Sequence, residues 1–306
     1  IDHLMTAGDI FLMCLIIYLS VKHGKVLPII LSIAQTAIVL YTEFTVDVKE
    51  GAHMMVDWLT ILMCIIIAFI GGFICIYTVG YMKGYHAHHK DVKDRQPFFF
   101  SMLFLFLAAM FGLVLSQNLI WIYFFWEITS VISFLMIGYT KTDEAVNNSF
   151  CALWINLLGG LGFAVAIALM ANLHGTLQLL EVVNIGALLP LMCLSLAGLT
   201  KSAQLPFSTW LLGAMVAPTP SSALLHSATM VKAGVYLLIR ISPALEGNLV
   251  GIIVSSIGGL TFIMASMMAI AQNDAKKVLA FSTISNLGLI VACSGIGVEE
   301  TVWAAI

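Results

Sequence analysis

Residues 119–140 read LIWIYFFWEITSVISFLMIGYT, and this stretch decides the fold class. It carries a single charged side chain, Glu127, and a helix needs about 20 mostly apolar residues to cross a bilayer. In lipid each backbone N–H and C=O group must be satisfied within its own segment, so a spanning stretch of this kind is a helix. Because similar stretches recur along the chain, we expect an all-α integral membrane protein, a polytopic bundle of about 10–11 helices.

The composition supports this fold class. Of the 306 residues 61% are hydrophobic and 9% are charged, whereas about 25% of the residues in a soluble domain are charged. The net charge is −3 and no dense run of Lys and Arg occurs, which argues against nucleic acid as a partner.

The six cysteines stand singly without metal-ligand spacing, so we expect no metal site. The chain starts without Met and stops as an apolar run begins, so we expect truncated ends, and we assign no signal peptide.

The apolar runs and their capping signals place the spans. Asp57 can cap the third helix and Pro97 can open the fourth. Pro218 and Pro220 are expected to keep the chain extended before the eighth. The expected spans are 4–20, 26–42, 57–82, 97–116, 119–140, 146–173, 185–212, 223–241, 249–272 and 277–294, with an eleventh opening near residue 302.

The basic residues of the loops predict the orientation. Loops after odd-numbered helices hold nine Lys and Arg residues, and loops after even-numbered helices hold two. Since cytoplasmic loops are enriched in Lys and Arg, we expect the N-terminus outside and the loop 83–95 inside. The two basic residues that were counted in neither set of loops, Lys201 and Lys232, both fall inside expected spans.

Glu127 is an acid deep within the fifth helix, roughly 12 Å from its start at a rise of 1.5 Å per residue. Tyr123 and Ser130 share its helix face and predict a polar stripe that could hold water. Acids within a membrane are costly and usually mark ion paths, so we interpret Glu127 as a proton carrier. The alternative is a protonated side chain that a neighbouring helix satisfies.

Lys201 lies near the middle of the seventh span, in AGLTKSAQLPFSTW. Gln204 and Ser208 follow at i+3 and i+7, which predicts a polar stripe along one helix face. Pro206 removes the N–H that Ser202 C=O would have accepted, so we expect a break beside the lysine. Broken helices at mid-membrane line ion sites. Snorkelling to the interface is the alternative, but the lysine is far from both ends.

The eighth span contains His226 near its start and Lys232 about half way. Six residues at roughly 100° each put the two side chains about 120° apart, which suits a relay that crosses the helix. Contact of His226 with interfacial water is the alternative. We hypothesise that Glu127 pairs with Lys201 in one state, and that their separation drives the Lys201 proton toward Lys232 or His226. Such a pair, 4 Å apart, is worth about 4 kcal/mol at an effective dielectric constant of 20.

Two weaker polar groups complete the set. His86, His88 and His89 lie in the charged loop 83–95, where solvation is the better interpretation than metal binding. Ser285 and Asn286, with Ser282 one turn before them, would either extend a wet path in the tenth helix or hold helices together.

Three stretches resemble a known family. FWEITSVISFLMIGY (125–139), KSAQLPFSTWLLGAMVAPTPSSALLHSATMVKAGVYLLIR (201–240) and DAKKVLAFSTISNLG (274–288) are similar to antiporter-like membrane subunits. That family is shared by respiratory complex I, Mrp sodium/proton antiporters and membrane-bound nickel-iron hydrogenases of the Ech and formate hydrogenlyase type. The resemblance implies that Glu127, Lys201, His226 and Lys232 occupy the ion-path positions of helices 5, 7 and 8.

The resemblance also implies a fold of two inverted five-helix repeats with a broken helix 7. We accordingly expect three N-terminal helices in 1–96, a first repeat with the ion path in 97–241, and the start of a second repeat in 249–306. The second repeat is cut after its second helix, so the family's exit lysine or glutamate on a later helix is not among these residues.

The expected function is proton translocation, or Na⁺/H⁺ antiport, by a membrane subunit of a redox-driven complex. ALWINLLGGLGFAVAIALM (152–170) is most similar to hydrogenase and Mrp large subunits, so we expect an Ech-type hydrogenase host, with an Mrp antiporter or complex I as alternatives. The resemblance implies no cofactor or redox centre in this chain, and nickel-iron and iron-sulfur centres in partner subunits. The expected partners are other membrane subunits and a peripheral redox arm, in the cytoplasmic membrane of the cell.

Other functional classes fit the residues less well. A haem subunit needs axial ligands within the bilayer, but six of the eight histidines fall in or beside expected loops. No nucleotide-binding motif occurs, so energy would come from partners or from an ion gradient. A lipid-modifying enzyme would need its nucleophile and base near one interface, and Glu127 and Lys201 lie too deep.

Overall fold

The computed structural model describes residues 2–46, 48, 51–90 and 92–305. This part of the chain contains helices without a strand, and nine spans in it are long and apolar enough to cross a membrane. Eight of these spans are centred on α1 Asp2–Lys22, α2 Val26–Thr45, α3 Trp58–His88, α4 Gln96–Leu115, α5 Leu119–Ile137, α6 Asp143–His174, α12 Leu249–Ile270 and α13 Ala275–Ile296. The expected all-α polytopic membrane fold is confirmed.

The seventh expected span, 185–212, is interrupted. A short helix, α7 (Leu179–Ile185), precedes α8 (Leu188–Lys201), and α9 (Thr209–Gly213) follows after non-helical residues 202–208. Ala203 in this segment adopts a left-handed conformation with φ 53°, and the Leu205–Pro206 peptide bond is cis. Pro206 has no N–H to continue a helical ladder, as the sequence indicates, and the predicted break beside Lys201 is confirmed.

The eighth expected helix, 223–241, is not continuous, and this part of the prediction is wrong. The ninth membrane span consists of α10 (Thr219–Ala223), a π-helical turn (Leu224–Ala228) and α11 (Met230–Ile241). Pro220, expected to keep the chain extended, is helical, because a helix tolerates proline in its first turn. Thr229, between the last two, has φ −148°, and its hydroxyl donates to the carbonyl of Leu224. The helix is therefore wider at this turn than in α11. Residues before Thr229 and residues after it do not follow one continuous α-helical periodicity.

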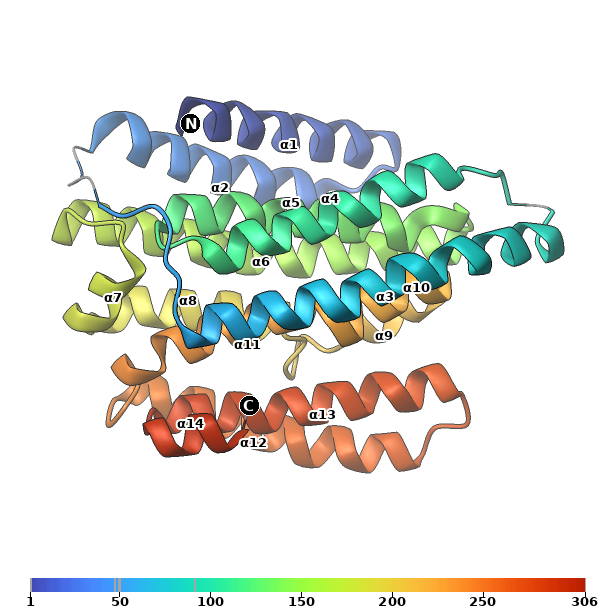
Figure 1. The fold of residues 1–306 in the computed structure, drawn as a ribbon. Coiled ribbons are helices and arrows are strands. Elements are labelled where there is room, and N and C mark those ends of the chain that lie inside the picture. Colours follow the sequence, from blue (N-terminus) through green and yellow to red (C-terminus); the bar gives the residue numbers. More distant parts are fainter. Residues whose placement is uncertain (1, 47, 49–50, 91, 306) are drawn as a thin grey trace.

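Figure 1 shows how the helices are layered. α1 and α2 cover α5 and α6 on one side, and the hairpin of α12 and α13, with α14 (Glu299–Ala305), forms the other side. α8 and α11 lie between these two layers and pack on each other. In the apolar windows of α5 and α6 67% of the residues are buried, against 33% in α3 and α12, so the core lies along α5, α6, α8 and α11.

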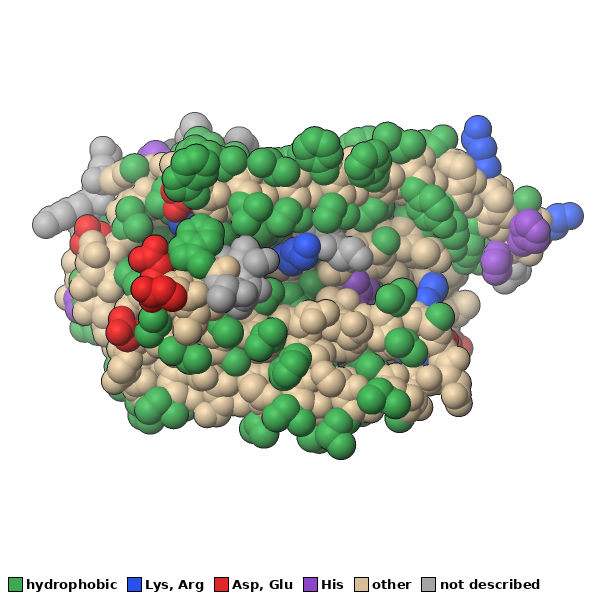
Figure 2. Space-filling view, turned by 60° about the horizontal axis from the view of Figure 1, so that its bottom comes forward, with side chains coloured by type: hydrophobic (Ala, Val, Ile, Leu, Met, Phe, Trp, Pro, Cys, Tyr) green, Lys and Arg blue, Asp and Glu red, His purple; other side chains and the backbone are tan. Residues whose placement is uncertain are grey.

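The peripheral helices present apolar side chains to their surroundings. Phe11 on α1, Phe73 on α3 and Ile263 on α12 are more than half exposed, as expected of residues that face lipid. Figure 2 shows such side chains over the face it presents, with acidic side chains gathered toward one end and Lys, Arg and His side chains toward the other. At that second end Arg95 repels the ammonium of Lys141, which lowers the Lys141 pKa. The ends of the bundle thus differ in charge.

The polar ends of the helices are closed by specific contacts. Asp57 caps α3, as predicted, by accepting a hydrogen bond from the backbone N–H of Thr60 at 2.8 Å. Its carboxylate also forms an ion pair with Arg240 at the end of α11. The hydrogen bond from Arg240 holds the pKa of Asp57 well below its ordinary value, and the bond from Thr60 adds to this.

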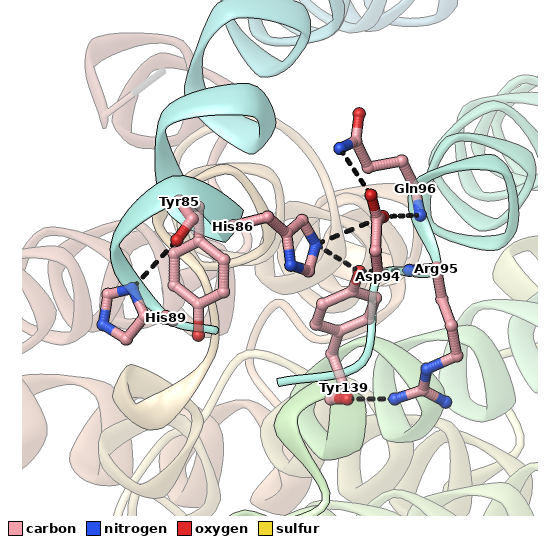
Figure 3. Close-up of polar contacts among 7 residues, drawn as sticks. All are labelled: Tyr85, His86, His89, Asp94, Arg95, Gln96 and Tyr139. Atoms are coloured by element: carbon pink, nitrogen blue, oxygen red, sulfur yellow. Dashed lines mark hydrogen bonds and ion pairs between the residues drawn. The ribbon is translucent and has the colours of Figure 1, made fainter. Parts of the chain in front are cut away.

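A second polar contact joins α3, α4 and α5 at the basic end (Figure 3). α3 runs to His88, beyond the expected end at residue 82, so His86 is helical rather than part of a solvated loop. Its Nε2 lies 3.0 Å from the Tyr139 hydroxyl and 3.5 Å from Asp94, and the Arg95 guanidinium donates to the Tyr139 carbonyl. Within the described ranges no group of three His, Cys, Asp or Glu side chains could hold a metal ion.

Candidate functional site

Lys201 is the last residue of α8 and is completely buried. Its ammonium donates to the Ser130 hydroxyl at 2.8 Å and to the Trp126 carbonyl at 2.9 Å, both on α5. It also lies 4.7 Å from the centre of the Trp126 ring, a distance at which a cation is attracted to the ring face. Polar and aromatic groups of α5, rather than water at an interface, therefore hold the lysine, which excludes snorkelling in this state.

Two glycines let α8 and α11 approach closely beside this lysine. A Cβ added to Gly234 on α11 would lie 2.5 Å from the carbonyl oxygen of Gly198 and 2.7 Å from the Ser202 nitrogen. These neighbours are backbone atoms, so a larger residue would push the end of α8 away. The glycine contact thus sets the position from which Lys201 reaches α5.

Glu127 lies on α5 and is 3% exposed. Its Oε2 accepts a hydrogen bond from the Gln35 amide on α2 at 2.8 Å, and its Oε1 has no partner among the residues that the structure describes. Ion pairs in those residues occur at His86–Asp94 and Arg240–Asp57, but not between Glu127 and Lys201. The structure therefore shows no ion pair between Glu127 and Lys201: Glu127 on α5 bonds Gln35 of α2, and Lys201 bonds Ser130 and Trp126 of α5. Their pairing in another state stays a hypothesis.

The two supporting residues of α5 have different surroundings. Ser130 binds Lys201 directly and also donates to the Trp126 carbonyl. Tyr123 is 1% exposed, and its hydroxyl has no partner in the described part of the chain. The polar face predicted on α5 thus reaches the lysine at one end and leaves a buried hydroxyl beside Glu127 at the other.

The predicted polar stripe of Lys201, Gln204 and Ser208 is wrong, because the helix ends at the lysine. Gln204 is buried in the non-helical segment, where its amide donates to the Ser202 carbonyl at 3.0 Å. Ser208 is also buried and directly precedes α9. These residues, with Pro206, line the break rather than one helix face.

His226 lies in the π-helical turn and is 7% exposed. Neither of its ring nitrogens has a partner among the described residues. Lys232 is half-buried on α11, beyond the break at Thr229. The predicted separation of 120° does not apply, because it assumed one continuous helix. π-Helical turns are frequent at functional sites. An imidazole with two unpaired nitrogens has the chemistry that a proton-transfer group needs.

Two buried polar residues of the site escaped the sequence analysis. Gln35 on α2 and Asp9 on α1 are 2% and 5% exposed, and Asp9 lies close enough to Glu127 for their carboxylates to repel each other. The signal for Asp9 was present, since it is an acid within the first expected span. Gln35 is uncharged, and only the fold brings it to Glu127.

Family models match two parts of the chain. The model described as "NADH:quinone oxidoreductase/Mrp antiporter, TM" matches residues 116–306, and "NADH-Ubiquinone oxidoreductase (complex I), chain 5 N-terminus" matches residues 45–91. Among curated proteins, the "Putative antiporter subunit mnhA2" of Staphylococcus aureus (strain USA300 / TCH1516) is 40% identical over 263 residues, covering 83% of this chain and 32% of the relative. The chain thus spans about a third of the length of the curated relatives it matches.

Solved structures share the fold. A chain of the Mrp complex from Dietzia sp. DQ12-45-1b superposes with a TM-score of 0.75 and 29% identity, over 99% of this chain and 35% of that one. A chain of the membrane-bound sulfane sulfur reductase, an archaeal respiratory membrane complex, superposes with a TM-score of 0.74 at 19% identity, over 99% of this chain and 66% of that one. The second likeness concerns the fold alone.

Proposed function

The chain belongs to the family of membrane subunits that includes those of NADH:quinone oxidoreductase and the Mrp antiporters, and on this premise we propose that it translocates protons through Glu127, Lys201, His226 and Lys232. The observation that carries the proposal is the buried lysine at the end of a broken membrane helix, held by neutral groups and separate from a buried acid. Such a lysine can exchange partners, because its carboxylate counter-ion is near but not bound.

The positions of the groups support one order for the relay. Glu127 lies on α5, and Lys201 at the end of α8 contacts the neighbouring residues Trp126 and Ser130 of that helix. α8 packs on α11, which carries Lys232 and follows the turn of His226. A proton released from Lys201 therefore has acceptors on the next element of the fold. Tyr123, Gln204 and Ser208 supply polar groups along the way, and Ser130 holds the lysine in the separated state.

We place the chain in an Mrp-type antiporter complex of the cytoplasmic membrane, with its N-terminus outside. The 40% identical relative is named as an antiporter subunit and the 29% identical structure is that of an Mrp complex, which favours this host over the Ech-type hydrogenase indicated by residues 152–170. The partners would be other membrane subunits of that complex. An Na⁺/H⁺ exchange driven by the ion gradient would then replace a peripheral redox arm as the source of energy.

The proposal is tested in the complete complex reconstituted into vesicles. Lys201→Met and Glu127→Gln are each expected to lower proton flux by roughly a hundredfold, the lower range for a positioned proton-transfer group. Lys83→Met, which removes an exposed lysine of the basic end, serves as the control and should keep the flux. Undiminished flux in Lys201→Met would exclude the proposed path.

The host is tested separately by elemental and flavin analysis of the complex purified through a tag on this chain. Absence of iron and nickel supports the Mrp assignment. Nickel with abundant iron would replace it by a hydrogenase, and iron with flavin would replace it by complex I.

A further inference from the structure

Two buried oxygen atoms face one position between α2, α5 and α6 and lack a hydrogen-bond donor. They are Oε1 of Gln35 and Oε1 of Glu127, and neither has a partner among the described residues. A Cβ added to Gly160 on α6 would lie 2.5 Å from the Glu127 oxygen and 2.7 Å from the Gln35 oxygen, so both atoms face the space that this glycine leaves open. The amide nitrogen of Gln35 binds the other oxygen of Glu127, which fixes the direction of the amide oxygen.

Two oxygens arranged in this way can bind a cation. Two buried acceptor oxygens that face one position are destabilising unless a donor or a positive charge lies between them. Carboxylate and amide oxygens are hard ligands that suit a proton or a small alkali cation. A divalent or transition metal is disfavoured, because the described residues contain no cluster of three His, Cys, Asp or Glu ligands.

A line of acids connects this position with one end of the bundle. Asp9 on α1 is 5% exposed, its Oδ1 has no partner among residues 2–46, 48, 51–90 and 92–305, and the carboxylates of Glu127 and Glu43 both repel its own. Glu43, near the end of α2, accepts a hydrogen bond from Thr6 on α1.

Glu43 is also accessible from the outside of the bundle. With Thr42, His53 and Asn118 it lines a surface pocket of about 210 Å³, where α2 ends and α5 begins. Acidic side chains therefore run inward from this pocket, past α1, to the oxygens at Gly160.

We infer that Gln35, Glu127 and Gly160 form a binding niche for a monovalent cation, a proton or Na⁺. The cation reaches this niche by way of Glu43 and Asp9, from the end of the bundle where α2 ends. The niche rests on the proposed function in one respect, that Glu127 belongs to the ion path. It adds a branch on the side of α1 and α2 that does not pass through Lys201, His226 or Lys232.

The first test measures cation flux of variants in the complete complex. Gln35→Leu removes the amide oxygen together with the amide hydrogen bond to Glu127, and should lower the flux about tenfold, as expected from one lost hydrogen bond to a charged group. Gly160→Ala leaves that bond in place and fills the open space, and should lower the flux as well because it excludes the cation. Gly259→Ala, where a Cβ would meet nothing within 4 Å, and Gln272→Leu, a half-buried position that follows α12 outside the niche, are the matched controls. Gln35→Leu carries the test where Gly160→Ala does not fold.

A separate variant tests the part that Asp9 plays in the line of acids. Asp9→Asn keeps the shape of the side chain and removes its charge, and should lower the flux about tenfold as well. Glu181→Gln, which neutralises an exposed acid on α7, should leave it unchanged. Flux that stays at the wild-type level in Asp9→Asn would remove Asp9 from the branch.

The infrared carbonyl band of a protonated Glu127 identifies the occupant, with Glu127→Gln assigning the band. If Na⁺ occupies the niche, Na⁺ added at constant pH removes the band in the wild type but not in Gln35→Leu. If a proton occupies the niche, added Na⁺ leaves the band unchanged, and the band shifts in Gln35→Leu. A band and flux unchanged in both Gln35→Leu and Gly160→Ala overturn the niche alone. Undiminished flux in Glu127→Gln overturns the proposed path as well.

Discussion

The Lys201 ammonium donates to the Ser130 hydroxyl at 2.8 Å, so a neutral group of α5 holds the lysine where a carboxylate had been expected. The contact joins the end of α8 to the helix that carries Glu127. Because a hydroxyl binds an ammonium more weakly than a carboxylate does, the lysine can leave this position at moderate cost.

Removing the Ser130 hydroxyl should slow translocation. A hydrogen bond to a charged group contributes about 1.5–3 kcal/mol, so Ser130→Ala is expected to lower proton flux about tenfold or more. Ser130→Thr keeps the hydroxyl and should retain most of the flux. Ser133→Ala is the control, because Ser133 donates to Thr129 and Met230 and not to the lysine. Equal flux in Ser130→Ala and the wild type would show that this contact has no part in the path.

Gly234→Ala should displace the end of α8. The added methyl group would meet the backbone of Gly198 and Ser202, and overpacking of this kind costs about 1–3 kcal/mol. We expect a lower unfolding temperature in detergent together with reduced flux. Gly72→Ala, on the surface of α3 with nothing within 4 Å of a Cβ, should change neither measurement. A Gly234→Ala protein with full flux would mean that α8 tolerates the shift.

The ion pair of Asp57 and Arg240 should make stability depend on acid pH. The folded pKa of Asp57 lies below its unfolded value of about 3.9, so its contribution is complete above that value and is lost as the pH falls below it. Thermal unfolding between pH 3 and pH 7 should show this loss in the wild type and a smaller one in Asp57→Asn. Glu181→Gln should follow the wild type. Parallel curves for wild type and Asp57→Asn would contradict the assignment.

Tyr139→Phe should weaken the contact of α3 with α5 at the basic end. The buried hydroxyl bonds His86 and accepts from the backbone N–H of Arg95, and one such bond is worth about 1 kcal/mol. The unfolding temperature should fall by a few degrees. Tyr77→Phe, at a position 52% exposed, should leave it unchanged. The same unfolding temperature in both variants would show that the hydroxyl bonds water equally well when unfolded.

The sequence predicts the single helices well because their length and polarity are local properties. Glu127 lies where the expected span 119–140 puts it, and Asp57 caps α3 as its position before an apolar run indicates. The break after Lys201 was also predictable, since Pro206 lacks an N–H. The division into 1–96, 97–241 and 249–306 and the inverted repeats stay predictions.

What the sequence could not show depends on contacts between helices. The stripe of Gln204 and Ser208 assumed that the helix continues, and the relation of His226 to Lys232 assumed that no π-helical turn intervenes. Both assumptions follow from local periodicity and fail where tertiary packing sets the backbone. Gln35 shows the same limit, because only the packing of α2 on α5 and α6 makes it a partner of Glu127.

The early end of α8 has an electrostatic consequence. The peptide dipoles of a helix add up to about half a negative charge at its C-terminus, and in a helix that crosses the whole membrane this charge meets water. Here the helix ends at a buried lysine, so the negative end of its macrodipole lies inside the protein beside the residue that carries the positive charge. The backbone itself thereby provides a fixed, non-titratable counter-charge, which leaves the Glu127 carboxylate free to take up and release a cation.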